Sequence, residues 1–176
     1  HPLVSNDYAG IAYLVVTTEQ GFVGDLNTKV VTRAIQEKEK NPNSVFITIG
    51  RRGVAKVDQF GHKSIKTFED LDDQKSYELA LTVKDYLVEQ IMTGKIGKIS
   101  VVYPWPKELG AIKPRVVRLL PCEHVLRKQS QLMDMLKYVI EESDPVELVG
   151  YMANIWLTSR LFEIFFDTAL AAASAQ

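Results

Sequence analysis

Three short apolar segments, separated by segments of helical pattern, constrain the fold more than any other feature of the sequence. They cover residues 11–16, 45–50 and 99–103 and are rich in valine and isoleucine. Residues 11–16 are continuously apolar, which is typical of a strand that is buried on both faces of a sheet, and the other two segments resemble them. One-sided apolar patterns at residues 25–40 and 73–93 predict helices between them. We therefore predict an α/β fold with a mostly parallel sheet and right-handed crossovers.

The strands that follow have no intervening helices, so we expect them to extend the sheet in antiparallel fashion. Residues 116–120 predict a fourth strand, ended by Pro121, and residues 136–141 predict a short edge strand. We expect the Pro-Trp-Pro sequence at 104–106 to end the third strand, because proline cannot donate to a strand ladder. Residues 51–71 have a mixed pattern that assigns them to no element.

The C-terminal segment predicts one long helix. Asp144, Pro145 and Glu147 occupy the N-cap, N1 and N3 positions of a capping-box pattern, and no proline follows. A helix over residues 145–176 would be about 48 Å long, against a radius of gyration near ~16 Å for a body of this size. We expect its early part to pack on the sheet. Its later part should project and meet another helix.

Composition and charge exclude several classes of protein. The 176 residues are 46% hydrophobic, which suits one compact domain. The 21 basic and 22 acidic residues leave a net charge of −1, so no bulk charge favours nucleic acid. Cys122 is the single cysteine, which excludes an internal disulfide and a cysteine-based zinc site. The longest uncharged stretch, residues 148–159, is shorter than the roughly 18–20 residues of a membrane-spanning helix.

The turn after the first strand is the first candidate binding site, because α/β proteins often bind phosphate there. Its glycines, Gly21 and Gly24, do not have the spacing of a dinucleotide or P-loop motif. Asp25 places a carboxylate where a phosphate would otherwise meet the helix N-terminus. We expect a structural turn with no catalytic, cofactor-binding or metal-binding residues.

Two other groups of residues are candidates for a catalytic or a metal-binding site. Cys122 and His124 resemble a nucleophile and base, but no third group lies nearby in sequence and an ordinary loop pair is favoured. The acidic run at residues 69–73 lacks the spacing of an EF-hand loop and is expected to supply negative charge to the start of the next helix.

Two motifs carry a resemblance to a known family. Residues 17–27 read Thr-Thr-Glu-Gln-Gly-Phe-Val-Gly-Asp-Leu-Asn. They resemble the T-S-D-[RK]-G-L-C-G-G-[LF]-N segment of the rotary ATP synthase gamma subunit. Residues 49–53, Ile-Gly-Arg-Arg-Gly, resemble the family's I-G-[RK]-[KR]-G segment. Leu-Pro at 120–121 and the pattern of residues 138–167 follow in the family's order, so the resemblance covers nearly the whole chain.

The resemblance implies a Rossmann-like three-layer sandwich without a nucleotide site over residues 1–143. Residues 144–176 would then begin the long C-terminal helix of a coiled-coil shaft. It also implies a non-catalytic central-stalk rotor that couples transmembrane ion flow to ATP synthesis or hydrolysis in partner subunits. The implied partners are the catalytic and non-catalytic hexamer subunits, the epsilon subunit and the membrane ring subunits, with no nucleic acid and no cofactor. The implied location is peripheral, at the cytoplasmic face of the cell membrane or the equivalent inner-membrane side in an organelle.

The residues that match the first motif are expected to be structural: Gly21, Gly24, Leu26 and Asn27. Arg51 and Arg52 are expected to contact partner subunits. The chain departs from the family pattern at Val23, at Asp25 and in residues 168–176. It starts at His1 and stops inside the helix, so we expect both ends to have been cut from a longer shaft. The alternatives are an α/β nucleotide-binding enzyme that uses the Gly21–Gly24 turn and a stand-alone interaction domain.

Overall fold

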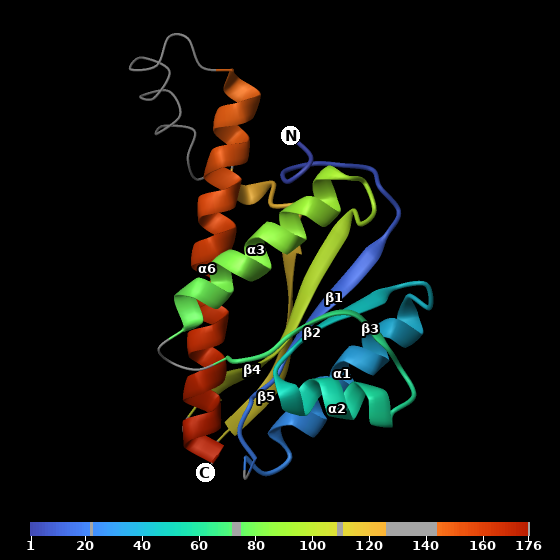
Figure 1. Cartoon of the computed structure of the whole chain (residues 1–176), viewed down its shortest axis with the longest axis vertical. Coiled ribbons are helices and arrows are strands. Elements are labelled where there is room, and N and C mark those ends of the chain that lie inside the picture. The colour runs from blue at the N-terminus through green and yellow to red at the C-terminus, as the bar shows by residue number, and fades with distance from the viewer. Residues whose placement is uncertain (22, 72–74, 109–110, 126–143, 176) are drawn as a thin grey trace.

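The computed structural model describes residues 1–21, 23–71, 75–108, 111–125 and 144–175 (Figure 1). These residues form one α/β body with three layers. The elements in chain order are β1 (Ile11–Val16), α1 (Leu26–Lys40), β2 (Val45–Ile49), α2 (Arg51–Gln59), β3 (Ser64–Phe68), α3 (Ser76–Met92), β4 (Lys98–Glu108), β5 (Ala111–Leu120) and α6 (Pro145–Ala175).

The sheet has the strand order β3-β2-β1-β4-β5, with β1 at its centre. The first four strands of that order are parallel and β5 is antiparallel to β4. The predicted α/β class, the mostly parallel sheet and the antiparallel extension are therefore confirmed. Each parallel connection carries a helix or a helical segment, as crossovers require.

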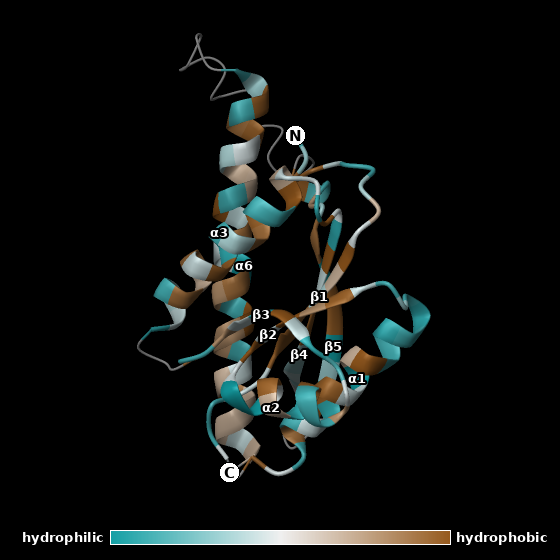
Figure 2. Cartoon of the chain, turned by 45° about the vertical axis from the view of Figure 1, so that its right-hand side comes forward, coloured by the Kyte–Doolittle hydropathy of each residue, from teal (hydrophilic) through white to brown (hydrophobic). Residues whose placement is uncertain are grey.

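Side chains of β1 alternate between two cores, which explains its unbroken apolar sequence. Ala12, Leu14 and Val16 face the larger core, together with apolar side chains of α3 and α6. Tyr13 and Val15 face the smaller core, together with side chains of α1 and α2. The outer faces of α1 and α2 are hydrophilic, whereas the strands are mostly apolar (Figure 2). The arrangement is the predicted three-layer sandwich.

The predicted elements agree with the structure at β1, β2 and α1 to within one residue. The unassigned segment at residues 51–71 contains α2 and β3. Gly53 and Val57 are the buried residues of α2, so the helix has too few buried apolar side chains for a periodic signal. The structure places α3 at Ser76–Met92, and the predicted start at residue 73 lies outside the described residues. The predicted edge strand at residues 136–141 also lies outside them.

The prediction that proline ends the third strand is wrong. β4 continues through residues 104–106 and pairs with β5 beyond the last β1 partner, where Val15 pairs with Val102. Pro104 lies opposite Pro114. Two prolines fit opposite each other where the backbone N–H groups point away from the partner strand. Among the described residues, no strand pairs with β4 on that side beyond Val102, so no ladder hydrogen bond is lost there.

The predicted long helix is confirmed, but its later part does not project from the body as expected. The Asp144 carboxylate accepts a hydrogen bond from the Val146 N–H at 3.0 Å, as the capping pattern predicts. Buried residues run from Gly150 to Ala172, so α6 packs on the body along nearly its whole length. The β4–β5 hairpin, which extends past the rest of the sheet, and the turn before α1 provide the surface for its last turns (Figure 1). Within the described residues, no helix has the length and apolarity that crossing a membrane requires.

Candidate functional site

The predicted site residues lie at the carboxyl edge of the sheet, in the β1–α1 and β2–α2 turns. These turns are neighbours because β1 and β2 are adjacent parallel strands, and the Thr17 N–H donates to the Ile49 carbonyl at 2.9 Å. The structure therefore brings together both motifs on which the family resemblance depends.

Asn27 closes the β1–α1 turn on itself. Its Oδ1 accepts from the Thr18 N–H at 3.1 Å, and its Nδ2 donates to Thr18 Oγ1 at 2.9 Å. Asn27 and Thr18 are both buried, so each polar group needs such a partner. Asn27 is thus a structural residue of the turn, placed at the first turn of α1.

Thr17, Gly50 and Gly53 form a close contact that the sequence did not single out. Thr17 Oγ1 donates to the Ile49 carbonyl at 2.8 Å and accepts from the Gly53 N–H at 2.9 Å. A Cβ atom at Gly50 would lie 2.5 Å from the Thr17 carbonyl oxygen, and one at Gly53 would lie 2.2 Å from Thr17 Oγ1. The two glycines of the second motif therefore leave room for Thr17. The repeated glycines were the only sequence signal of this contact.

Glu19 occupies the N-terminus of α2. Both carboxylate oxygens lie 3.2 Å from the backbone nitrogen of Arg51, which donates to them. The Arg51 side chain lies between two carboxylates, 4.0 Å from Glu19 and 4.0 Å from Glu69. A helix N-terminus attracts anions through its free N–H groups and its dipole. Here the protein's own carboxylate takes that position.

Glycine is favoured at positions 21 and 24 for different structural reasons. A Cβ at Gly21 would lie 2.9 Å from an Nη atom of Arg52, so the Arg52 guanidinium rests against this glycine. Gly24 has a φ of +61° and open space around it, so its backbone conformation, not crowding, favours glycine. Arg51 and Arg52 remain exposed at this edge of the sheet.

The crevice beside β1 is partly filled by α6, and an open pocket of about 230 Å³ remains at the β1–α1 turn. Val23 and Leu26 form a buried cluster with Ala171 and Ala172 of α6. Asp25 precedes α1 and its carboxylate pairs with Lys29 at 3.4 Å. The N-terminus of α2 is thus occupied by Glu19 and the crevice is narrowed by α6, whereas Asp25 makes no side-chain hydrogen bond that caps α1.

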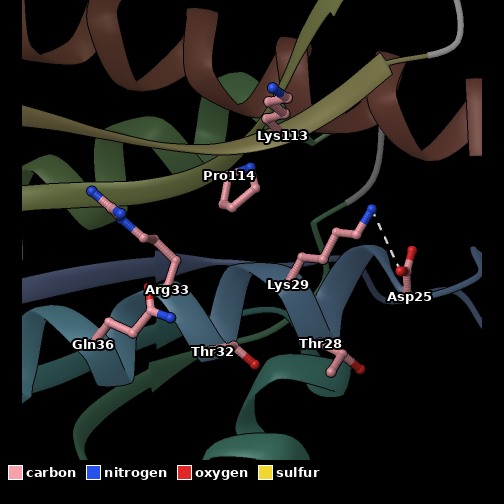
Figure 3. Close-up of a pocket in the computed structure, with 8 residues that line it drawn as sticks. All are labelled: Asp25, Thr28, Lys29, Thr32, Arg33, Gln36, Lys113 and Pro114. Carbon is pink, nitrogen blue, oxygen red and sulfur yellow. Dashed lines mark ion pairs between the residues drawn. The ribbon is translucent and has the colours of Figure 1, made fainter.

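An open groove of about 410 Å³ lies between α1 and β5 (Figure 3). Lys29, Arg33 and Lys113 give it a positive character, and Pro114 points into it (Figure 3). Arg33 pairs with Glu37 at 3.1 Å and Lys29 pairs with Asp25, so two of the three cations already have carboxylate partners. The groove is shallow, and most of its exposed lining surface is apolar in spite of these cations.

Cys122 and His124 do not form a reactive pair. Cys122 is fully buried and its Sγ donates to the Leu3 carbonyl at 3.2 Å. Burial raises the pKa of this thiol to about 11, so it stays protonated at neutral pH. The His124 ring instead packs edge-on against Trp156, 4.7 Å between centroids. Within the described ranges, no group of three or more His, Cys, Asp or Glu side chains is placed to hold a metal ion.

The face of α6 that points away from the sheet carries large exposed apolar side chains. We call this row the α6 stripe; its members are 41–66% exposed and are Tyr151, Ile155, Phe162, Phe166 and Leu170. Their spacing of three, four or seven residues and multiples of these places them along one side of the helix. Tyr77 of α3 extends the surface, with its ring 6.0 Å from that of Phe162.

A groove of about 410 Å³ between α3 and α6 borders the stripe at Tyr151 and Ile155. The sequence predicts the helix but does not distinguish this exposed side from the buried one, on which Met152 lies in the larger core. A row of exposed apolar side chains this long is more than scattered exposure.

Comparison with known proteins gives a consistent result. A family model described as ATP synthase matches residues 1–176. The ATP synthase gamma chain of Psychrobacter cryohalolentis is 30% identical over 184 residues, covering 100% of this chain and 63% of the relative. That of Pelotomaculum thermopropionicum is 29% identical over 125 residues, covering 70% of this chain and 44% of the relative. The chain thus spans 44–63% of the length of these two relatives.

Solved structures agree on the fold. The central stalk and c-ring structure of the Tetrahymena thermophila mitochondrial ATP synthase matches with a TM-score of 0.72 at 12% identity. That match covers 97% of this chain and 74% of the other. The rotor of the Euglena gracilis mitochondrial ATP synthase matches with a TM-score of 0.66 at 21% identity, covering 94% and 63%. At these identities the likeness shows a common fold.

Proposed function

The chain belongs to the ATP synthase gamma family, and we propose that it is a central-stalk rotor component of a rotary ATP synthase. In this role it couples transmembrane ion flow to ATP synthesis or hydrolysis in partner subunits. Residues 1–143 are the Rossmann-like globular part and residues 144–176 begin the coiled-coil shaft.

The α6 stripe is the observation that carries the proposal. Each Å² of apolar surface that is buried contributes about 25 cal/mol of stabilising free energy, so burial of these side chains would stabilise a helix packed along α6. A two-helix shaft needs such a stripe on each helix. The groove between α3 and α6 widens the same surface at its N-terminal end.

The carboxyl edge of the sheet supports a role without chemistry of its own. Glu19 occupies the N-terminus of α2, and the α6 residues Ala171 and Ala172 narrow the crevice at which related folds bind nucleotides. We propose that the chain has no catalytic site and that ATP is handled by the partner hexamer.

Partners follow from the same proposal. The chain contacts the catalytic and non-catalytic hexamer subunits, the epsilon subunit and the membrane ring subunits. The exposed guanidinium groups of Arg51 and Arg52 are positioned to meet carboxylates of a partner. The protein is then peripheral, at the cytoplasmic face of the cell membrane or the equivalent inner-membrane side in an organelle.

Assembly tests the proposal. The chain, in the context of its whole gene, is co-expressed with the other subunits of the complex from the same organism, and its recovery in the purified complex is measured. We expect stoichiometric recovery, reduced at least tenfold by Phe166→Asp. Phe60→Asp is the matched control, because Phe60 is 48% exposed at the end of α2, outside the α6 stripe.

Two results would contradict the rotor role. One is a chain that stays outside the complex although every other subunit assembles. The other is micromolar binding of ATP, ADP or NAD in calorimetric titration, lost on Gly24→Val, which would favour the nucleotide-binding enzyme.

A further inference from the structure

The last turns of α6 are held by a segment more than 140 residues earlier in the chain. Val23 and Leu26, from the β1–α1 turn, share a buried cluster with Ala171 and Ala172. Ile112 of β5 and Ala175 pack against the same cluster and are partly buried. The turn and the hairpin thus contact α6 from the body of the domain.

Alanine at these two positions permits the close approach. Ala171 is 0% exposed and Ala172 is 8% exposed, whereas the next residue, Ala173, is exposed. Protein interiors are close-packed, so an added methyl group fits only if a neighbouring side chain or helix moves. A larger side chain at 171 would therefore push α6 away from the turn, and a larger one at 173 would extend into solvent.

α6 also packs against α3 further back along the helix, where Leu157 shares the larger core with Val83 and Leu87. Thr158 lies beside this contact, on the rim of the groove between the two helices. From Thr158 to Ala171 the helix rises about 20 Å at 1.5 Å per residue. A helix held at two places this far apart is fixed in direction, and asymmetric contacts at both places also fix its rotation about its own axis.

We propose that the cluster of Val23, Leu26, Ala171 and Ala172 is a clamp that locks the shaft helix to the globular part, so that torque passes between them without slip. Val23 and Ala171 are its positioning residues. The proposal rests on the rotor function. It adds a mechanical role for the β1–α1 turn, which lies where related folds bind the phosphate of a nucleotide.

A volume exchange tests the contact. Val23→Ala removes two methyl groups from the turn and Ala171→Val adds two to the helix, so the double variant keeps the total volume of the cluster. In the assembled complex we measure ions pumped per ATP hydrolysed. We expect each single variant to lower this ratio at least twofold, and the double variant to recover most of it, as interacting neighbours do. Ala173→Val is the control and is expected to keep the wild-type ratio.

Hydrogen exchange provides a second readout in the same full-length variants, independent of pumping. Val23→Ala should raise exchange at the amides of Ala171 to Ala175 at least tenfold, with amides near Thr158 unchanged. The clamp is refuted if the single variants match Ala173→Val in both pumping ratio and exchange. Failure of the rotor proposal looks different, because the wild-type chain would then not enter the complex at all.

Discussion

The backbone N–H of Arg51 donates to the carboxylate of Glu19 at 3.2 Å, although 32 residues separate the two in the sequence. This contact ties the β1–α1 turn to the start of α2. It also explains how two motifs that are far apart in the chain act as one structural unit.

Removal of the Glu19 carboxylate is expected to destabilise the fold. Glu19→Ala leaves the backbone N–H of Arg51, at the start of α2, without its charged acceptor, at a cost of about 1–2 kcal/mol. Urea denaturation followed by circular dichroism measures the change. Glu69→Ala is the matched control, because the half-exposed Glu69 carboxylate makes only a long ion pair with the Arg51 side chain, 4.0 Å from Nε. The loss of this pair should change the free energy of unfolding by no more than about 0.5 kcal/mol. Equal losses for both variants would rule out the capping role.

The glycines of the two motifs should differ in their tolerance of alanine. Gly53→Ala places a Cβ against Thr17 Oγ1 and is expected to cost about 3 kcal/mol, the reverse of the usual gain for this change in a helix. Gly24→Ala meets open space and should cost about 1 kcal/mol, through its positive φ alone. Thermal unfolding of both variants gives the order, and a larger loss at Gly24 would contradict the packing argument.

Two buried tyrosines should respond oppositely to loss of the hydroxyl. Tyr103 is fully buried, and its hydroxyl has no hydrogen-bond partner among the described residues. Tyr103→Phe should therefore leave stability unchanged or raise it by up to about 1 kcal/mol. Tyr13→Phe removes the acceptor of the Asn41 Nδ2 hydrogen bond at 2.9 Å and should cost about 1 kcal/mol. Chemical denaturation distinguishes these outcomes, and a comparable loss for both would show that the Tyr103 hydroxyl is paired.

Asp167 gives the fold a pH dependence of known sign. Burial, and then the neighbouring Glu163 carboxylate, raise the pKa of Asp167 in the folded state; Arg160 of α6 and Arg115 of β5 oppose this. A raised pKa means that Asp167 favours folding below its unfolded value of about 3.9 and loses that contribution as pH rises through the folded value.

Asp167→Asn should accordingly be more stable than wild type at pH 7, with the advantage shrinking toward pH 3. Glu163→Gln provides the contrast, because it breaks the 3.0 Å ion pair with Arg160 and should give no gain at pH 7. Denaturation midpoints between pH 3 and pH 8 measure both variants. An Asn variant that is less stable at pH 7 would refute the sign.

Local patterns were sufficient for the central elements of the fold. β1 is unbroken apolar and β2 is apolar except for Thr48, because both faces of these strands are covered, and α1 has a single apolar side. α2 and β3 lie at the margin of the sheet, where few side chains are buried, so their sequences carry little periodic signal. The continuation of β4 through Pro104 depends on which side of the strand lacks a partner, and no local pattern contains that information.

The candidate site was predicted in outline. Its glycines and Asn27 stood out by their resemblance to a family motif, and the structure gives each of them a packing or hydrogen-bonding role. The roles of Thr17 and Glu19 depend on partners 32 to 36 residues away, which only the β1–β2 register brings near. The contact of Ala171 with the β1–α1 turn depends on the path of α6 across the body.

A protein that binds a dissolved ligand at the edge of its sheet becomes more stable as the concentration of that ligand rises. Here Glu19 fills the start of α2 permanently, because the ligand is covalently part of the chain. Its effective concentration is fixed by the fold, and neither dilution nor competition in a nucleotide-rich compartment removes it. The N-terminus of α2 therefore keeps its acceptor independently of any dissolved ligand.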